Sequence, residues 1–291
     1  YWFCRELHCQ RRHRCLIMGV RSLGNALSSF GYKFGTTGLE AVSPYVPPPE
    51  VPAGAVHFLE FGGSNASFTD QIGNGTGGTT SLNFTVNTSK MALNDTTYGG
   101  PPGYTNAGFQ ADAVTNLTAM RTAEDVIPDI SGDFTIDVCS YNAIAPASDS
   151  NIVWCIADYD NTGGYSNYIY NASGSCRFDT SNTTWNDRLG EAGGSTNYTQ
   201  NKWCVSRLRR SSGTMYVEWY EENSGGTGWD LKSGGFNGSV TGDGPNTNNS
   251  AGGAMLINSW PNSSSYSIAN LGVAWIAFFE SSYTNTPWVP S

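Results

Sequence analysis

The chain has 291 residues, of which 13% are charged and 13% aromatic, and its formal net charge is −9. The aromatic content excludes an intrinsically disordered protein. The length allows one large β domain or two ordinary domains. The sequence contains no run of about 18 apolar residues, so it predicts no membrane span.

The charge is distributed unevenly along the chain. Residues 1–21 hold five arginines and one glutamate, a net charge of +4, and the remaining ten basic and 23 acidic residues give −13. An acidic body of this kind argues against nucleic-acid binding by the main domain.

The first 17 residues are basic and rich in cysteine and histidine. The composition changes directly after Met18, so we expect residues 1–17 to be a leader upstream of the true start. The alternative is a zinc site, although the spacing matches no common structural zinc pattern. Its ligands would be Cys4, His8, Cys9, His13 and Cys15.

Residues 18–50 are predicted to form an extended anchoring arm and a proline-rich linker. Segment 19–43 is rich in glycine and serine and cannot bury a core of its own, so its apolar residues are expected to pack on a neighbouring protein. The run Pro44–Pro49 favours polyproline II and acts as a semi-rigid spacer. The sequence of the arm is similar to N-terminal segments of tailed-phage virion proteins. This similarity implies that residues 19–50 bind other virion proteins. The anchoring candidates are Leu23, Leu27, Phe30 and Phe34.

Residues 51–291 are predicted to form an all-β, two-sheet antiparallel sandwich. The strongest signal is a hairpin at Lys202–Glu222, where two alternating runs flank Ser211-Ser212-Gly213. Segment 109–120 is ambiguous between a strand and a short helix. Gly/Asn/Thr-rich stretches predict loops, notably at 62–80, 94–108, 181–201 and 223–253. Further strands are expected at 55–61, 81–89, 133–141, 151–159, 165–170, 175–178, 254–260 and 267–280.

The order of these elements resembles the laminin-G-like branch of the concanavalin A-like jelly rolls, over about residues 132–280. The resemblance is carried by Asp133–Val138, by Gly163-Gly164-Tyr165, by Trp203 in the hairpin and by the last strand. The sequence departs from the family pattern at two places. Cys139 stands where the family has a tryptophan in a strand. In the final strand, Asn270–Val273 stands where the family has an acidic residue followed by Glu-Val. The resemblance implies a jelly roll, but this fold carries lectins, adhesion modules, glycosidases and virion proteins.

No catalytic residues are predicted. Glucanases of this superfamily carry E-x-D-x-E or E-x-D-x-x-E on one strand, whereas Tyr220 lies between Glu218 and Glu222 here. We expect these glutamates to be solvent-facing strand acids. His57 is the one histidine outside residues 1–17 and no G-x-S-x-G elbow occurs, so a Ser-His-Asp triad is not expected.

The sequence offers candidates for a glycan site and for a calcium site. Glycan binding would use exposed aromatic rings, and the alternative for each candidate is ordinary packing across a sheet. Members of the fold often bind calcium at the rim, and Asp158, Asp160 and Asn161 form the best local cluster of hard ligands. We favour Asx turns for that cluster and expect no cofactor. The glycan candidates are Tyr165, Tyr168, Trp185 and Trp229.

The cysteines and the N-x-S/T sequons do not decide whether the protein resides in an oxidising compartment. Cys139, Cys155, Cys176 and Cys204 lie in predicted strands, where they form two disulfides in an oxidising compartment or remain buried thiols. We favour free thiols. Twelve N-x-S/T sequons fit a secreted glycoprotein, but they also follow from Asn/Thr-rich loops.

The resulting hypothesis is a non-enzymatic virion structural protein. It would be a surface decoration or fibre whose lectin-like sandwich stabilises the particle or binds host glycans. The alternative is a secreted or cell-surface lectin-like adhesion module, with calcium and glycosylation. We expect a homo-oligomer, a trimer by analogy with fibres of this architecture.

Overall fold

The computed structural model of the chain divides into two units, Tyr1–Pro49 and Glu50–Ser291, and each is described by itself. The first unit is described over 32–35 and 38–41 only. In the second unit the structure describes residues 50–62, 65–75, 81–86, 91–92, 98–104, 109–111, 120–123, 126–142, 151–158, 166–172, 175–181, 185–189, 201–232, 238–241, 253–257 and 271–291.

A β-hairpin lies in the first unit. Strands β1 (Tyr32–Gly35) and β2 (Gly38–Ala41) pair antiparallel, with Gly35 opposite Gly38. The sequence predicted an extended arm here and missed this pairing. Glycines at both strand ends suit a tight reversal. Of the predicted anchoring residues, Phe34 lies in β1, whereas Leu23, Leu27 and Phe30 lie outside the described residues, as does the leader 1–17.

The second unit is built from β-strands, and none of its described residues is helical. No helix of the described chain is therefore long and apolar enough to cross a membrane. In chain order the strands are β3 (His57–Glu60), β4 (Ser67–Phe68), β5 (Phe84–Val86), β6 (Met91–Ala92), β7 (Phe109–Ala111), β8 (Met120–Thr122), β9 (Phe134–Asn142), β10 (Asn151–Asp158), β11 (Ser166–Ala172), β12 (Ser175–Ser181), β13 (Trp185–Leu189), β14 (Lys202–Ser211), β15 (Thr214–Glu222), β16 (Trp229–Leu231), β17 (Gly238–Thr241), β18 (Gly253–Ile257) and β19 (Leu271–Phe279).

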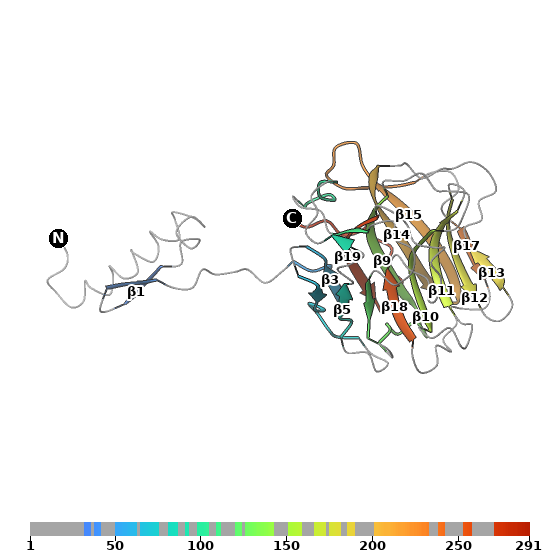
Figure 1. Cartoon of the computed structure of the whole chain (residues 1–291), viewed down its shortest axis with the longest axis horizontal. Coiled ribbons are helices and arrows are strands. Elements are labelled where there is room, and N and C mark those ends of the chain that lie inside the picture. The colour runs from blue at the N-terminus through green and yellow to red at the C-terminus, as the bar shows by residue number, and fades with distance from the viewer. Residues whose placement is uncertain are drawn as a thin grey trace. The chain divides into compact units, whose positions relative to one another are not determined.

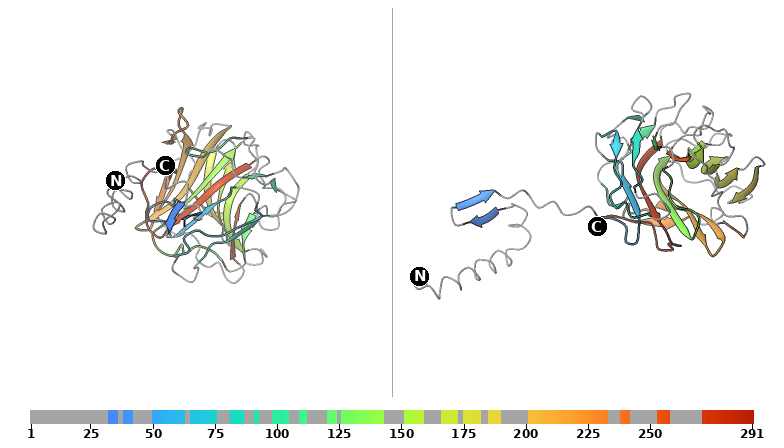
Figure 2. Two further views of the ribbon diagram at one scale, coloured as in Figure 1. Left: turned by 90° about the vertical axis from the view of Figure 1, so that its left-hand side faces the viewer. Right: turned by 90° about the horizontal axis from the view of Figure 1, so that it is seen from below.

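These strands form two sheets that face each other (Figure 1 and Figure 2). The smaller sheet has eight strands in the order β13-β12-β11-β10-β18-β8-β5-β4. The larger sheet has nine strands, in the order β16-β15-β14-β9-β19-β7-β6, with β17 also paired to β15 and β3 to β19. All pairings between these named strands are antiparallel, and one isolated parallel bridge joins Val126 to Ala254. The predicted two-sheet antiparallel sandwich is confirmed.

Most predicted strands are present, and the differences are short strands. The ambiguous segment 109–120 contains β7 and the start of β8, so its described parts are strand rather than helix. Strands β4, β13, β16 and β17 lie in stretches that were predicted to be loops, and β6 was not predicted either. Each has at most five residues, too few for an alternating pattern to stand out.

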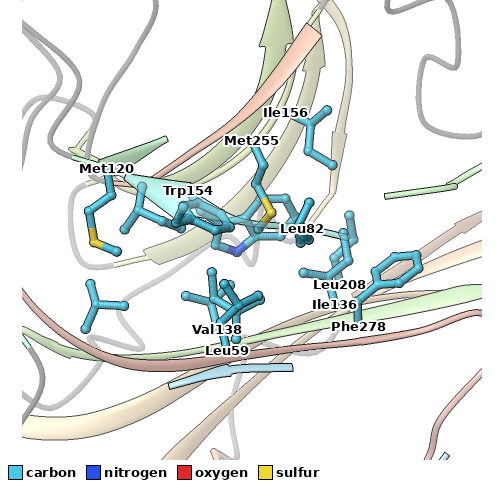
Figure 3. Close-up of a cluster of buried hydrophobic side chains, with 14 of the residues drawn as sticks. Leu59, Leu82, Met120, Ile136, Val138, Trp154, Ile156, Leu208, Met255 and Phe278 are labelled. Atoms are coloured by element: carbon cyan, nitrogen blue, oxygen red, sulfur yellow. The ribbon is translucent and has the colours of Figure 1, made fainter. Parts of the chain in front are cut away.

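The main core fills the space between the sheets. Figure 3 shows Trp154 and Met255 of the smaller sheet meeting Val138 and Leu59 of the larger one, and all four are fully buried. Because alternate residues of a strand point to opposite faces, each strand of the larger sheet sends only every second side chain into this core. The other side chains form a second face, which carries the polar groups described below.

Three cysteines of the described residues are buried and form no disulfide, namely Cys139, Cys155 and Cys204. Cys139 lies opposite Val205 and Cys204 opposite Ser140, so the two thiols of this strand pair lie on opposite faces of the sheet. Cys155 belongs to the other sheet. Burial raises the pKa of the Cys139 and Cys155 thiols, which keeps them unreactive. The side chain of Cys176 lies outside the described residues.

The turn between β14 and β15 gives a first testable prediction. Ser212 has a φ of 48° and Gly213 a φ of 80°, and Ser211 pairs with Thr214, as in a two-residue hairpin turn. A Cβ at position 213 would meet nothing within 4 Å, so a substitution acts through the backbone alone. Gly213→Ala is expected to lower the free energy of unfolding by about 1–2 kcal/mol, the cost of a left-handed non-glycine residue. Urea denaturation measures this, with Ser212→Asn as a control expected to be neutral or stabilising. Equal midpoints for Gly213→Ala and the wild type would refute the turn assignment.

Candidate functional site

The face of the larger sheet that points away from the main core carries a second group of buried residues. We call it the outer face. It includes Phe58, Trp203, Tyr220 and Trp275. Residues 281–291, the C-terminal segment, lie on it, with the Trp288 ring 4.8 Å from that of Phe58 and 5.9 Å from that of Trp275. The end of the chain therefore closes a second, smaller core.

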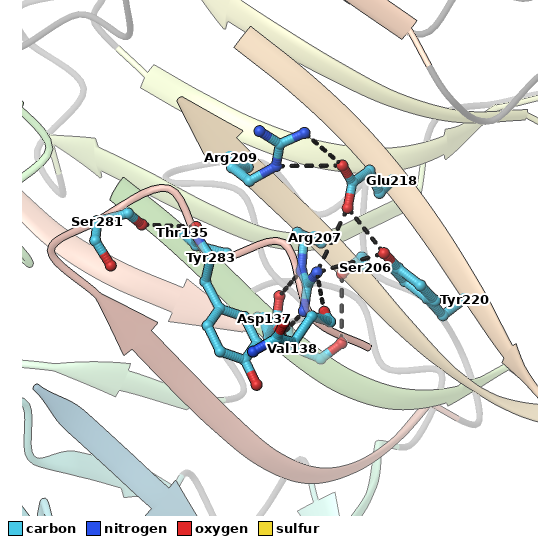
Figure 4. Close-up of polar contacts among 11 residues, drawn as sticks. Thr135, Asp137, Val138, Ser206, Arg207, Arg209, Glu218, Tyr220, Ser281 and Tyr283 are labelled. Carbon is cyan, nitrogen blue, oxygen red and sulfur yellow. Dashed lines mark hydrogen bonds and ion pairs between the residues drawn. The ribbon is translucent and has the colours of Figure 1, made fainter. Parts of the chain in front are cut away.

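An arginine stands at the centre of the outer face. Arg207 of β14 lies directly opposite Asp137 of β9 and Glu218 of β15. Its Nε and Nη2 atoms donate to the two oxygens of Asp137 at 2.6 and 2.7 Å, and Nη1 donates to the carbonyl oxygen of Asn285 at 2.7 Å (Figure 4). Arg207 is 0% exposed, and a bidentate pair of this kind is among the strongest polar contacts in proteins. It joins three elements: β9, β14 and the C-terminal segment.

Glu218 is also part of this arrangement. Its carboxylate lies 2.8 Å from Arg209 and 3.5 Å from Arg207, and Tyr220 donates its hydroxyl to it at 2.9 Å. The expectation that Glu218 is a solvent-facing acid was wrong, because its side chain is only 15% exposed. Two arginines of the neighbouring strand, which the sequence did not place opposite it, cover the carboxylate. Together Asp137, Glu218, Arg207 and Arg209 form a charge-balanced group, here called the arginine cluster.

Within the arginine cluster, the surroundings of Arg207 favour its charged form. Burial alone would lower the pKa of Arg207, but the Asp137 carboxylate outweighs it and raises that pKa above its usual value. Burial is also the largest influence on Tyr220, whose pKa rises even though the positive charge of Arg207 opposes the change. The tyrosine therefore remains a protonated donor to Glu218.

A histidine–aspartate pair lies at the start of β3, where His57 is opposite Phe278 of β19. His57 is buried, and its Nδ1 lies 2.5 Å from Oδ2 of Asp70. Burial would raise the pKa of Asp70, but the hydrogen bonds from His57 and from backbone N–H groups lower it below its usual value. The sequence predicted no partner for His57, because Asp70 lies 13 residues away in a predicted loop. Besides His57, Asp70 accepts from the backbone N–H groups of Phe58, Ile72, Gly73 and Leu82.

Of the predicted glycan-binding residues, Trp229 is the one whose side chain the structure describes. Trp229 is 7% exposed, and its Nε1 donates to the carbonyl oxygen of Trp288 at 3.0 Å. Its ring belongs to the second core, so packing rather than stacking with a sugar describes it. Tyr168 lies opposite Cys155 and Trp185 opposite Ser181, but their side chains, and Tyr165 as a whole, lie outside the described residues.

The predicted calcium ligands lie mostly outside the described residues. Asp158 ends β10 opposite Gly253, and Asp160 and Asn161 are not described. Within the described ranges, no three acidic, histidine or cysteine side chains gather as metal ligands.

An aromatic group that the sequence did not single out lies at one end of the outer face. Tyr98 stacks on Tyr141 of β9 with ring centroids 4.3 Å apart and planes 15° from parallel. Trp203 of β14 meets Tyr141 edge-on at 5.4 Å, and its Nε1 donates to the Tyr98 carbonyl oxygen at 3.3 Å. Glu222 of β15 accepts a hydrogen bond from the backbone N–H of Trp203 at 3.4 Å. Both tyrosines are half-buried, so part of the stack reaches the surface.

No family model matches the chain, and no curated protein matches it. Solved structures do show similarities. A Trypanosoma rangeli sialidase in complex with sialic acid is 11% identical with a TM-score of 0.46, over 94% of this chain and 37% of that one. The binding domain of botulinum neurotoxin serotype D is 12% identical with a TM-score of 0.47, over 79% of this chain and 48% of that one.

A third similar structure is the heptameric SAP-like pentraxin of Limulus polyphemus. It is 13% identical with a TM-score of 0.35, over 52% of this chain and 65% of that one. The chain thus spans less than two thirds of each of these proteins. With TM-scores below 0.5, the similarities carry no argument about activity or ligand.

Proposed function

We propose that this chain is a non-enzymatic structural protein of a virion surface, a decoration or fibre protein. Residues 19–50 attach it to a neighbouring virion protein, and the sandwich projects outward. The observation that carries the proposal is the division of the chain after Pro49 into two units, at the end of a proline-rich spacer. A small unit that is separate from the sandwich suits an attachment segment.

The lack of catalysis is supported by the state of Glu218. A glycosidase acid needs a carboxyl group that can reach the glycosidic oxygen. The Glu218 carboxylate is instead paired with Arg209 at 2.8 Å and Arg207 at 3.5 Å, and its side chain is only 15% exposed. Hydrolysis of aryl glycosides by the purified chain that Glu218→Gln abolishes would contradict this part of the proposal.

Attachment through the first unit is tested on particles that lack the protein. We expect the full chain to cosediment with them, and replacement of Leu23, Leu27, Phe30 and Phe34 by serine to abolish cosedimentation. The control is Leu231→Ser, which removes an apolar side chain that is 50% exposed on the sandwich. Equal cosedimentation of the quadruple variant and the wild type would contradict the attachment role.

The second candidate is a secreted or cell-surface lectin-like module, and the half-exposed Tyr98–Tyr141 stack favours it. Three buried cysteines that form no disulfide argue against it, because secreted domains often carry disulfides. Electrophoresis with and without reductant, before and after deglycosylation, separates the two. Unchanged mobility supports the virion protein, and shifts in both comparisons support the secreted one. Light scattering of the full chain tests the proposed trimer.

A further inference from the structure

We propose that the end of the outer face at Tyr98, Tyr141, Trp203 and Glu222 binds an uncharged saccharide, and we call these four residues the aromatic platform. The two stacked rings cover one face of each other, so the apolar face of a pyranose ring would lie on the part of the tyrosine stack that reaches the surface, and Glu222 would accept hydrogen bonds from its hydroxyl groups. The proposal adds a ligand class and a site to the host-glycan binding that the sequence analysis expects of the sandwich. It rests on the proposed function only for its biological setting.

The strand register explains why these side chains meet. Tyr141 lies opposite Trp203 across the β9–β14 pair, and Glu222 follows in the same row on β15 because Cys204 lies opposite Glu221. On its other side Tyr141 lies opposite Gly272 of β19. Glycine has no side chain, so position 272 leaves room beside the Tyr141 ring. The ring of Tyr98, from a loop earlier in the chain, stacks on Tyr141.

The aromatic platform is held in place before any ligand binds. Trp203 is 1% exposed, contacts Tyr141 edge-on and holds the Tyr98 carbonyl group through its Nε1. The loop that follows Tyr98 is fixed as well, because the Tyr104 hydroxyl donates to Glu60 at 2.5 Å. A rigid surface loses little conformational entropy when a ligand binds.

The polar groups beside the rings suit hydroxyl groups. Glu222 receives only the 3.4 Å hydrogen bond from Trp203 among those described, which leaves acceptor capacity on its carboxylate. The ammonium of Lys202 donates to the Glu222 carbonyl oxygen at 3.1 Å and has further donors. Burial and the charge of Glu222 raise the pKa of Tyr141, so its phenol remains a donor. Donors and acceptors beside apolar rings are the usual composition of a saccharide site.

Charge selects against other ligands. Residues 22–291 carry a net charge of −13, which disfavours an anionic sugar. The arginines that would bind a carboxylate are already paired with Asp137 and Glu218. A quaternary ammonium group prefers rings set around it, whereas the two tyrosine rings lie only 15° from parallel.

The test measures saccharide binding by the full chain. Methyl glycosides of glucose, galactose and mannose, and N-acetylglucosamine, are titrated by saturation-transfer NMR and tryptophan fluorescence, with sialic acid and tetramethylammonium as charged probes. We expect saturable binding of at least one uncharged sugar. Tyr98→Ala and Tyr141→Ala should each raise its Kd at least about tenfold, which corresponds to about 1.4 kcal/mol. Glu222→Gln should weaken it less, and Tyr141→Phe should retain most of it.

Tyr216→Ala is the matched control, since Tyr216 is another half-buried tyrosine of the outer face, 3.9 Å from the Arg209 guanidinium. Its binding should equal that of the wild type, and thermal unfolding shows that every variant is folded. Absence of sugar binding, preferential binding of a charged probe, or wild-type binding by folded Tyr98→Ala and Tyr141→Ala would each overturn the proposal. A chain that binds no sugar but still attaches to particles would refute this site and leave the virion role intact.

Discussion

Replacing Arg207 with methionine is expected to lower the free energy of unfolding by about 3–5 kcal/mol, the usual cost of removing one partner of a buried ion pair. Methionine has a similar length but leaves the Asp137 carboxylate buried without a counter-charge. It also removes the donor to the Asn285 carbonyl group, so the C-terminal segment loses a contact to the sheet. Urea denaturation followed by tryptophan fluorescence measures the loss.

A double variant separates the charge effect from the loss of packing. Arg207→Met combined with Asp137→Leu removes both charges, and we expect it to recover much of the lost stability. Arg210→Met is the matched control: Arg210 is half-buried, and its Nη1 donates to the Ser131 carbonyl oxygen at 2.9 Å, so its replacement should change stability by only about 1 kcal/mol. A wild-type midpoint for Arg207→Met would show that the arginine cluster does not stabilise the sandwich.

The second large effect is expected at Asp70. Its carboxylate joins β3 to the segment 81–86, because it accepts from the backbone N–H groups of Phe58 and Leu82 as well as from His57. Asp70→Ala leaves these buried donors without an acceptor, and we expect a loss of at least about 3 kcal/mol at neutral pH, since each unsatisfied group costs about 1–3 kcal/mol.

The contribution of Asp70 should also depend on pH, and Asp70→Asn tests this. The folded-state pKa of Asp70 lies below its ordinary value of 3.8, so its stabilising contribution is complete above that value. The contribution is lost as the pH falls through 3.8 toward the lowered folded-state pKa. Urea midpoints between about pH 2 and 6 should therefore fall more steeply for the wild type than for Asp70→Asn. Asp230→Asn, a change at an exposed residue, should follow the wild type. Parallel profiles for the wild type and Asp70→Asn would contradict the assignment.

Local patterns made the central hairpin predictable. In the hairpin Lys202–Glu222, Trp203 and Val205 alternate with Cys204 and Leu208. The structure places the first two in the second core and the other two in the main core. Period-2 alternation depends only on neighbouring residues, so a sequence displays it directly. The same holds for the turn, because a short glycine-containing break is a local signal.

Partners far apart in the chain were not predictable. Asp137 lies 70 residues from Arg207, and the register of β9 against β14 decides that they meet. Glu218 was expected to face solvent because the pattern along its own strand does not reveal the arginines of the neighbouring strand. The pairing of His57 with Asp70 depends on a loop whose path no local pattern specifies.

The same reason explains why the sequence did not single out Tyr98 and Tyr141. The sequence offers many tyrosines and tryptophans, but exposure depends on what covers them. Trp229 is covered by the C-terminal segment, whose Trp288 carbonyl group it binds. Tyr98 and Tyr141, 43 positions apart in the sequence, are brought together by a loop that stacks on β9.

The virion role is the central claim, and imaging of purified particles from the source of this chain tests it most directly. We predict density for the sandwich outside the particle, joined to the particle surface by the first unit and lost from particles that lack the chain. The contradicting result is a particle of unchanged surface density, with the protein recovered instead from the medium in glycosylated form.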